Sequence, residues 1–339
     1  MTVDHPGDLV TYGWDERVSE RYAAVAEPGR IPGRVVQVQR GLCTVATPSG
    51  VRQASAYTLA SRRAGLGDDP ACGDWIAAVD DSDEGLALVA IVPRWSAIVR
   101  RQSDDRGGGE QVLIANADRV AIVLGLDRPV SANRLERTLA LVWESGAEPV
   151  VVLTKGDLVD DRSAIVVDTN EAAGEVDVIV TSVPMGMGLE EIRSLTHDGG
   201  TLAFLGPSGA GKSTLINALL GEEQQATGAV RSKDSRGRHT TVTRDLIPMP
   251  GGGVLIDTPG LRSLGLWEAE EGMAATFADI EELAVGCRFR DCHHAAEPDC
   301  AVRSAMAAGN LDARRLDSYH KLQSELHAAE RRTARRRQS

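Results

Sequence analysis

The pattern of apolar positions first separates an all-β segment from the rest of the chain. Short β-branched runs begin near residue 34, are broken by Gly41 and by the turn at 48–50, and continue at 74–79, 87–91 and 97–99. Five or so short strands within about 65 residues are typical of a small barrel. An OB-type Greek-key barrel is the best candidate, although few aromatic residues are available in it to stack on nucleic-acid bases.

From Val112 onward, apolar runs of strand length alternate with segments of helical periodicity. The expected strands lie at 120–125, 149–153, 176–181, 202–205 and 253–256. The expected helices lie at 132–145, 162–173, 189–195 and 212–220. This alternation predicts a parallel sheet with helices on both faces. Open sheets of this kind bind ligands at the carboxyl ends of their strands.

The chain should form several domains, because 339 residues exceed what one core usually supports. Residues 102–110 are polar, charged and glycine-rich, so they are predicted to form a linker. Ahead of the barrel, Trp14, Val18, Tyr22 and Val25 recur at helical spacing and predict a helix over 14–26. We expect an N-terminal domain at 1–101, an α/β domain at 111–270 and a helical domain at 271–339.

Composition limits the compartment and the partners. The hydrophobic content of 42% and charged content of 25% are ordinary for a globular protein. No apolar run approaches the ~18 residues of a membrane span, and the start lacks a signal-peptide layout. We expect a cytoplasmic monomer with no membrane partner. The net charge of −12 disfavours unspecific nucleic-acid binding, so any RNA must meet local basic patches. Residues 231–245 and the arginine-rich tail 331–339 are candidates, or are simply solvated.

A phosphate-binding loop is the clearest motif. Gly206, Gly211, Lys212 and Ser213 satisfy G-x-x-x-x-G-K-[ST] between a predicted strand and a predicted helix. A glycine-rich surface loop is the alternative, but the chain contains few lysines, so chance rarely places one at this position. Backbone amides would surround a polyphosphate while Lys212 reaches its β and γ oxygens. The expected phosphate-binding residues are Gly206, Pro207, Ser208, Gly209, Ala210, Gly211, Lys212, Ser213 and Thr214.

Two short motifs lie at strand ends ahead of this loop. Thr154, Lys155 and Asp157 belong to T-K-G-D, in which the carboxylate can accept hydrogen bonds from both N1–H and the amino group of guanine. Adenine does not present that donor pair. Thr181 and Ser182 follow the next strand and offer small side chains and amides to a base carbonyl. Each motif alone is better explained as a solvated turn.

Magnesium ligands are expected beyond the phosphate loop. Asp257 ends a strand within D-T-P-G, and Gly260 of that motif leaves room for the γ-phosphate. In the polar loop before it, Thr240 or Thr241 could close over the γ-phosphate and its Mg²⁺. The expected magnesium residues are Ser213, Thr241 and Asp257.

A metal site is indicated near the C-terminus. Cys287, Cys292 and Cys300 fall within 14 residues of one another together with His293 and His294. Three thiolates and one imidazole complete a closed tetrahedral zinc site that is structural, since no position remains for water. The alternative is a set of buried free cysteines. A helix over 311–329 is expected after it.

The motifs together resemble a known family. T-K-G-D, T-S-V, the phosphate loop, G-R-H-T-T and D-T-P-G are the five elements of a guanine-nucleotide-binding domain, but here the base-reading elements come first. On these motifs and the cysteine cluster, nearly the whole chain resembles the circularly permuted GTPases of the RsgA (YjeQ) family. The resemblance implies a GTPase that is stimulated by the small ribosomal subunit, binds its rRNA and acts in its late maturation. It favours His294 as the fourth zinc ligand.

One position departs from many GTPases. Leu261 follows D-T-P-G where a water-orienting glutamine is common, so intrinsic turnover should be slow. The resemblance makes His239 the candidate catalytic residue, although it could equally contact only backbone or RNA. Two other functions stay open: an RNA-binding assembly factor that uses GTP only as a conformational switch, and a phosphate-loop kinase for a small molecule.

Overall fold

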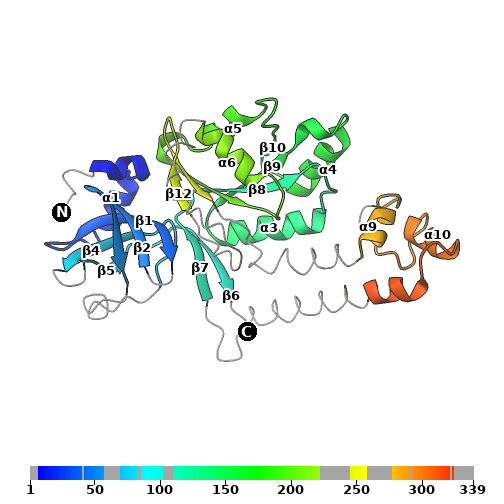
Figure 1. Cartoon of the computed structure of the whole chain (residues 1–339), viewed down its shortest axis with the longest axis horizontal. Coiled ribbons are helices and arrows are strands. Elements are labelled where there is room, and N and C mark those ends of the chain that lie inside the picture. Colours follow the sequence, from blue (N-terminus) through cyan, green and yellow to red (C-terminus); the bar gives the residue numbers. More distant parts are fainter. Residues whose placement is uncertain are drawn as a thin grey trace, which may run out of the picture. The chain divides into compact units, whose positions relative to one another are not determined.

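Figure 1 shows the computed structural model of the chain. It describes residues 7–39, 42–56, 69–81, 85–101, 110–221, 245–257, 277–289, 292–320 and 323. The chain divides into two compact units, residues 1–261 and residues 262–339. We call them the N-terminal unit and the C-terminal unit and describe each by itself.

The N-terminal unit begins with a closed five-stranded barrel, as the apolar pattern predicted. Its strands are β1 (Ile31–Gln39), β2 (Leu42–Thr47), β3 (Gly50–Ser55), β4 (Trp75–Asp81) and β5 (Gly85–Ile91). They pair in the order β1-β2-β3-β5-β4, and β4 closes the barrel on β1. Only the β3–β5 pair is parallel. The interior contains Val35, Ile76 and Leu88, all fully buried, so the hydrophobic effect holds the barrel together.

The helix ahead of the barrel is shorter than its periodicity predicts. A 3₁₀ turn, η1 (Gly7–Tyr12), precedes α1 (Glu16–Tyr22). Asp15 ends the extended segment before α1, because its carboxylate accepts a hydrogen bond from the Val18 amide at 2.7 Å and caps the helix. Trp14 therefore lies outside the helix, where its ring packs edge-on against Trp75 of the barrel.

The strand expected at 97–99 does not belong to the barrel. It is part of β6 (Ala97–Arg101), which pairs antiparallel with β7 (Glu110–Ala115) in a separate two-stranded sheet. Residues 102–109 lie outside the described residues, and they connect the two paired strands. The local pattern correctly predicted a strand at 97–99. It could not identify β7 as the partner, because pairing depends on residues further along the chain.

The second part of the N-terminal unit is the expected parallel sheet. Its strands are β8 (Arg119–Gly125), β9 (Glu148–Thr154), β10 (Val178–Val180), β11 (Thr201–Leu205) and β13 (Val254–Asp257). The order is β10-β9-β8-β11-β13, all parallel, and β12 (Asp245–Pro248) adds an antiparallel edge beyond β13. The sequence pattern did not predict β12.

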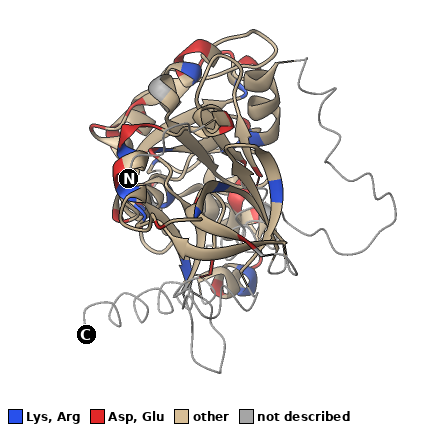
Figure 2. Cartoon of the chain, turned by 90° about the vertical axis from the view of Figure 1, so that its left-hand side faces the viewer, with Lys and Arg blue, Asp and Glu red and all other residues tan. Residues whose placement is uncertain are grey.

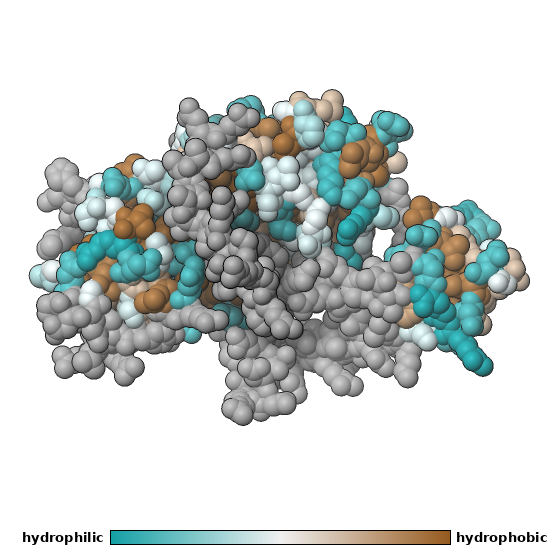
Figure 3. Space-filling model, viewed as in Figure 1, coloured by the Kyte–Doolittle hydropathy of each residue, from teal (hydrophilic) through white to brown (hydrophobic). Residues whose placement is uncertain are grey.

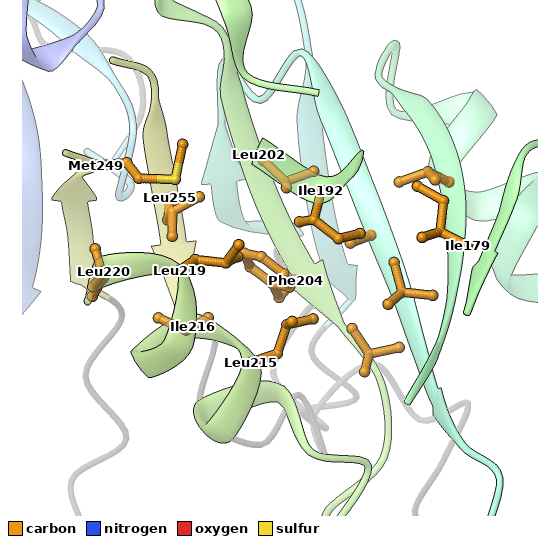
Figure 4. Packing of buried hydrophobic residues seen from close by; sticks show 14 of the residues in the cluster. Ile179, Ile192, Leu202, Phe204, Leu215, Ile216, Leu219, Leu220, Met249 and Leu255 are labelled. Atoms are coloured by element: carbon orange, nitrogen blue, oxygen red, sulfur yellow. The ribbon is translucent and has the colours of Figure 1, made fainter. Parts of the chain in front are cut away.

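Helices cover both faces of this sheet (Figure 1). They are α3 (Ala132–Glu144), α4 (Ser163–Ala173), α5 (Leu189–Ser194) and α6 (Lys212–Leu220). α3 packs on β8 and β9, and α4 packs on α3 and β10. On the other face, Leu215 and Leu219 of α6 and Ile192 of α5 meet Phe204 of β11, whose side chain is fully buried (Figure 4). This packing fixes the start of α6 directly beyond the end of β11.

A buried arginine joins the barrel to the parallel sheet. Arg34 of β1 is 1% exposed, donates to the Tyr12 carbonyl, and donates to Thr201 Oγ1 at 2.8 Å at the start of β11. Asp118 accepts from the Thr201 amide at 2.8 Å. Burial lowers the pKa of Arg34 to about 10, and Asp118 acts in the opposite direction. The guanidinium is therefore charged at pH 7 and needs these partners.

The C-terminal unit is helical, as expected. It contains α9 (Ala278–Ala284), α10 (Ala301–Ala307) and a further helix at 313–320, the described start of the helix expected over 311–329. Its small core includes Phe277 and Tyr319, whose rings meet edge-on at 5.5 Å. Exposed apolar side chains remain at Val285 and Phe289, and Figure 3 shows brown atoms on the surface of this unit. Among the described helices of both units, none is long and apolar enough to cross a membrane.

Replacing Arg34 tests the junction. Arg34→Ala should lower the free energy of unfolding of the N-terminal unit by about 3 kcal/mol, because it leaves buried acceptors unpaired. Arg52→Ala, which removes an exposed ion pair with Asp80, is the control and should change little. Urea denaturation followed by tryptophan fluorescence measures both variants. If both variants lower the free energy of unfolding by the same small amount, the buried guanidinium does not stabilise the junction.

Candidate functional site

The candidate site lies at one edge of the parallel sheet. β9, β10, β11 and β13 run parallel, so their carboxyl ends share an edge. Four predicted elements follow or end these strands: T-K-G-D, T-S-V, the phosphate loop and Asp257.

The phosphate loop has the backbone that its glycines permit. Gly206 lies against β8, where an added Cβ would come within 2.2 Å of the Val123 carbonyl oxygen, so no larger residue fits. Gly209 and Gly211 have φ angles of 77° and 89°, a region that disfavours other residues. Lys212 is 7% exposed, and its ammonium donates to the carbonyls of Gly206 and Pro207 at 2.7 Å each. Its charge is thus held inside the loop.

The neighbouring loop positions differ in exposure. Ala210 is buried, whereas Ser208, Gly209, Ser213 and Thr214 are exposed. The hydroxyl of Ser213 lies in the first turn of α6, where the unpaired amides of a helix favour anions. The loop therefore presents a helix start, a lysine and an exposed hydroxyl together.

The T-K-G-D motif is bonded to the phosphate loop. Thr154 is buried at the end of β9, and its hydroxyl donates to the Ala210 carbonyl at 2.5 Å. Gly211 packs on the same side chain, since an added Cβ would lie 3.2 Å from Thr154 Oγ1. Two motifs that are far apart in the sequence thus form one structure. Thr154 contributes a hydroxyl to this junction, and Asp157 at the end of the motif remains exposed.

Ser182 orients the predicted base-reading carboxylate. Its hydroxyl donates to Asp157 Oδ1 at 2.6 Å, and its side chain is fully buried whereas Asp157 is exposed. Backbone bonds between Ser182 and Met187 hold the serine, and the Gly156 amide donates to the Thr181 carbonyl at 3.0 Å. The sequence predicted that this segment meets the base. The structure adds a contact to Asp157 that no local pattern reveals.

Two residues at this edge were missed from the sequence. Asp127 and Arg128 follow β8, the strand between β9 and β11. Lys155 has a φ of 61°, unusual for a residue other than glycine, and its ammonium donates to Asp127 Oδ2 at 2.7 Å. Their position at the carboxyl end of a central strand was the available signal, because that is where open α/β sheets bind ligands.

Asp257 ends β13 and is 7% exposed. It pairs across the ladder with Asp245 of β12, whose carboxylate accepts from Gln37 of the barrel at 2.5 Å. The barrel therefore contacts the strand next to this aspartate. The other expected members of the site, His239, Thr240, Thr241 and Gly260, lie outside the described residues.

The C-terminal unit brings the predicted metal ligands together. The ligand atoms of Cys287, Cys292, His294 and Cys300 all lie within 4.8 Å of one another. The Cys287 and Cys300 sulfurs are 3.8 Å apart, and His294 Nδ1 lies 3.6 and 3.4 Å from them. A tetrahedral ion with Zn–S bonds of about 2.3 Å requires sulfur separations of about 3.8 Å. Cys287, Cys300 and His294 therefore already have separations that suit a tetrahedral metal ion.

The surrounding loop presents His294 and not His293. His294 is 4% exposed, and burial lowers its pKa, which favours the neutral imidazole that binds metals. His293 is exposed, and its carbonyl contacts His320 Nε2 at 2.9 Å. Glu297 accepts hydrogen bonds from the amides of residues 293, 295 and 296. Backbone hydrogen bonds, first from its own amide and then from His293, lower the pKa of Glu297 to about 2.

The sheet, its phosphate loop and the base-reading motif ahead of that loop define a P-loop GTPase whose elements are circularly permuted. The chain belongs to the RsgA GTPase family, whose family model matches residues 91–267. It is similar to the small ribosomal subunit biogenesis GTPase RsgA of Streptomyces avermitilis, with 47% identity covering 95% of this chain and 86% of that protein. The corresponding protein of Syntrophotalea carbinolica is 41% identical over 94% of this chain and 89% of its own.

A solved structure agrees with this assignment. The crystal structure of YjeQ from Thermotoga maritima matches with a TM-score of 0.51 and 25% identity, covering 88% of this chain and 98% of that one. The fold class inferred from the sequence is confirmed: a barrel, a permuted P-loop GTPase fold and a C-terminal helical unit with a Cys₃His cluster.

Replacing each histidine separately tests the metal centre. His294→Ala should remove bound metal from the purified protein, because it deletes the fourth ligand. His293→Ala is the matched control and should retain about one ion per chain, since its side chain is outside the cluster. Elemental analysis measures both. Metal loss in His293→Ala with retention in His294→Ala would reverse the ligand assignment.

Proposed function

We propose that this protein hydrolyses GTP to GDP and phosphate and that it acts in biogenesis of the small ribosomal subunit. The observation that carries the nucleotide part is the bond from Thr154 to Ala210, which joins the base-reading motif to the phosphate loop. The subunit part is supported by the names of relatives that are 41% to 47% identical over nearly the whole chain.

Each site residue has a role in this proposal. Gly209, Ala210, Gly211, Lys212 and Ser213 hold the phosphates through backbone amides and the Lys212 ammonium, while Thr214 continues the start of α6. Asp157, oriented by Ser182, pairs with guanine, and Thr181 and Lys155 flank the base. Ser213 and Asp257 serve Mg²⁺. From the sequence alone, Thr240 or Thr241 complete the magnesium site, Gly260 admits the γ-phosphate and His239 is the catalytic candidate.

Two metal ions belong to the proposal. Mg²⁺ accompanies GTP, because it neutralises the phosphate oxygens in this class of reaction. The Cys₃His cluster favours zinc, since thiolates and an imidazole in a closed tetrahedron suit that ion best. The zinc would stabilise the C-terminal unit and take no part in hydrolysis.

We propose further that the protein is a cytoplasmic monomer whose domains span 1–101, 111–270 and 271–339, with a linker at 102–110. Its rRNA contacts would be local. On the side of the molecule seen in Figure 2, acidic and basic residues are interspersed. This distribution supports contact through limited basic segments such as 231–245 or the tail 331–339, which lie largely outside the described residues.

GTP hydrolysis measured with and without purified small ribosomal subunits tests the proposal. The rate should rise severalfold or more with small subunits and not with large subunits at the same concentration. A rate unchanged by small subunits would contradict the ribosomal part. Absence of any hydrolysis in both conditions, with GTP still bound, would favour a role for GTP only as a conformational switch.

Asp157→Asn tests how guanine is recognised. It should weaken GDP binding by about 2 kcal/mol or more, because the amide places a donor opposite the guanine donors. The same variant should gain affinity for xanthosine diphosphate, whose C2 carbonyl accepts from the new amide. Asp160→Asn is the control, an exposed carboxylate nearby that should leave both affinities unchanged.

Equilibrium titration with fluorescent nucleotide measures these affinities. Unchanged GDP affinity in Asp157→Asn would show that this carboxylate does not read the base. Weaker GDP binding without a gain for the xanthine nucleotide would show that the substitution disturbs the site and not base recognition.

A further inference from the structure

An arginine, Arg128, lies beside the phosphate loop. Arg128 follows β8, which lies between the phosphate-loop strand β11 and the T-K-G-D strand β9. Its amide contacts the Gly125 carbonyl at 3.4 Å, and Pro129 follows it, which disfavours a helical backbone at Arg128. The arginine is therefore held in a turn at the central strand end of the nucleotide edge.

The side chain reaches the phosphate loop itself. Arg128 Nη2 lies 3.9 Å from the point where a Cβ on Gly209 would be, and among the described residues no other atom outside the adjoining ones is within 4 Å of that point. Gly209 is exposed and has a φ of 77°. Its lack of a side chain thus leaves the space beside the loop to a guanidinium.

The neighbouring carboxylate does not neutralise Arg128, so its positive charge is available to bind a ligand. Asp127, its neighbour in sequence, is paired with Lys155 at 2.7 Å. Within the described ranges, no carboxylate forms an ion pair with Arg128, and its side chain is exposed. Lys212, in contrast, is buried within the loop. Arg128 is thus a second cation at the loop, on a longer and freer side chain.

We propose that Arg128 is a further catalytic residue, which contacts the β–γ bridging oxygen and the γ-phosphate oxygens of bound GTP and stabilises the transition state. Guanidinium groups bind phosphate through two parallel hydrogen bonds, and an arginine supplied within the same chain serves this purpose in some GTPases. The inference rests on the proposed GTP hydrolysis and adds a residue to it. Leu261 makes such help important, because no glutamine stands at that position to orient water.

The step is simple in its chemistry. A water oxygen forms a bond to the γ-phosphorus as the bond from that phosphorus to the β–γ bridging oxygen breaks. The bridging oxygen leaves with its electron pair as part of GDP, and the proton lost by water passes to phosphate or solvent. Arg128 transfers no proton, and its fixed charge acts on the negative charge that develops on the bridging and γ oxygens.

Single-turnover hydrolysis by Arg128→Ala in the full-length protein tests the proposal. The rate should fall about 10- to 100-fold, the size expected for one charge-stabilising donor, while affinity for GDP changes little. Arg128→Lys should retain an intermediate rate, because it keeps the charge and loses the planar fork. Millimolar guanidinium, well below unfolding concentrations, should restore part of the rate of Arg128→Ala only.

Arg314→Ala, an exposed arginine of the C-terminal unit, is the matched control and should hydrolyse GTP at the wild-type rate. Thermal melting checks that all variants fold. An unchanged rate in Arg128→Ala would overturn the inference, as would equal losses of GDP and GTP-analogue affinity with unchanged turnover. In both cases wild-type hydrolysis would still support the proposed function. If the wild-type protein itself hydrolyses no GTP, the proposed function fails first.

Discussion

The parallel pairing of β8, β9 and β11 is the constraint on which the site depends. Parallel strands place their carboxyl ends at one edge, so the segments that follow them meet in space whatever their order in the chain. The hydrogen bond from Thr154 to Ala210 is the most direct result. Because the edge and not the chain order defines the site, circular permutation leaves the arrangement of its elements intact.

The barrel is connected to this sheet at two points that lead toward the site. Arg34 bonds to Thr201, where the strand carrying the phosphate loop begins. Gln37 bonds to Asp245, which pairs with Asp257 at the expected magnesium position. Both contacts come from the single strand β1. Displacement of the barrel would therefore act on the adjacent strands β11 and β13, which carry the phosphate loop and the expected magnesium aspartate.

The sequence predicted the features that are encoded locally. The helix predicted over 212–220 and the phosphate loop before it are present in the structure. Both were predictable because apolar spacing and the glycine–lysine motif are properties of adjacent residues. The partner of β6, the edge strand β12 and the contact from Ser182 to Asp157 were not predictable in this way. Each depends on residues that are brought together only after the chain folds. Asp127 was missed because a single carboxylate in a turn resembles any solvated residue until Lys155 is placed beside it.

The central claim is that this edge of the sheet forms a guanine-nucleotide site. Competition of GDP and of ADP against a fluorescent guanine nucleotide, in the same magnesium buffer, tests it most directly. The account predicts that GDP displaces the probe at concentrations at least about 100-fold lower than ADP, since buried hydrogen-bonding groups reject a base that cannot pair with them. Equal displacement by the two nucleotides would contradict it.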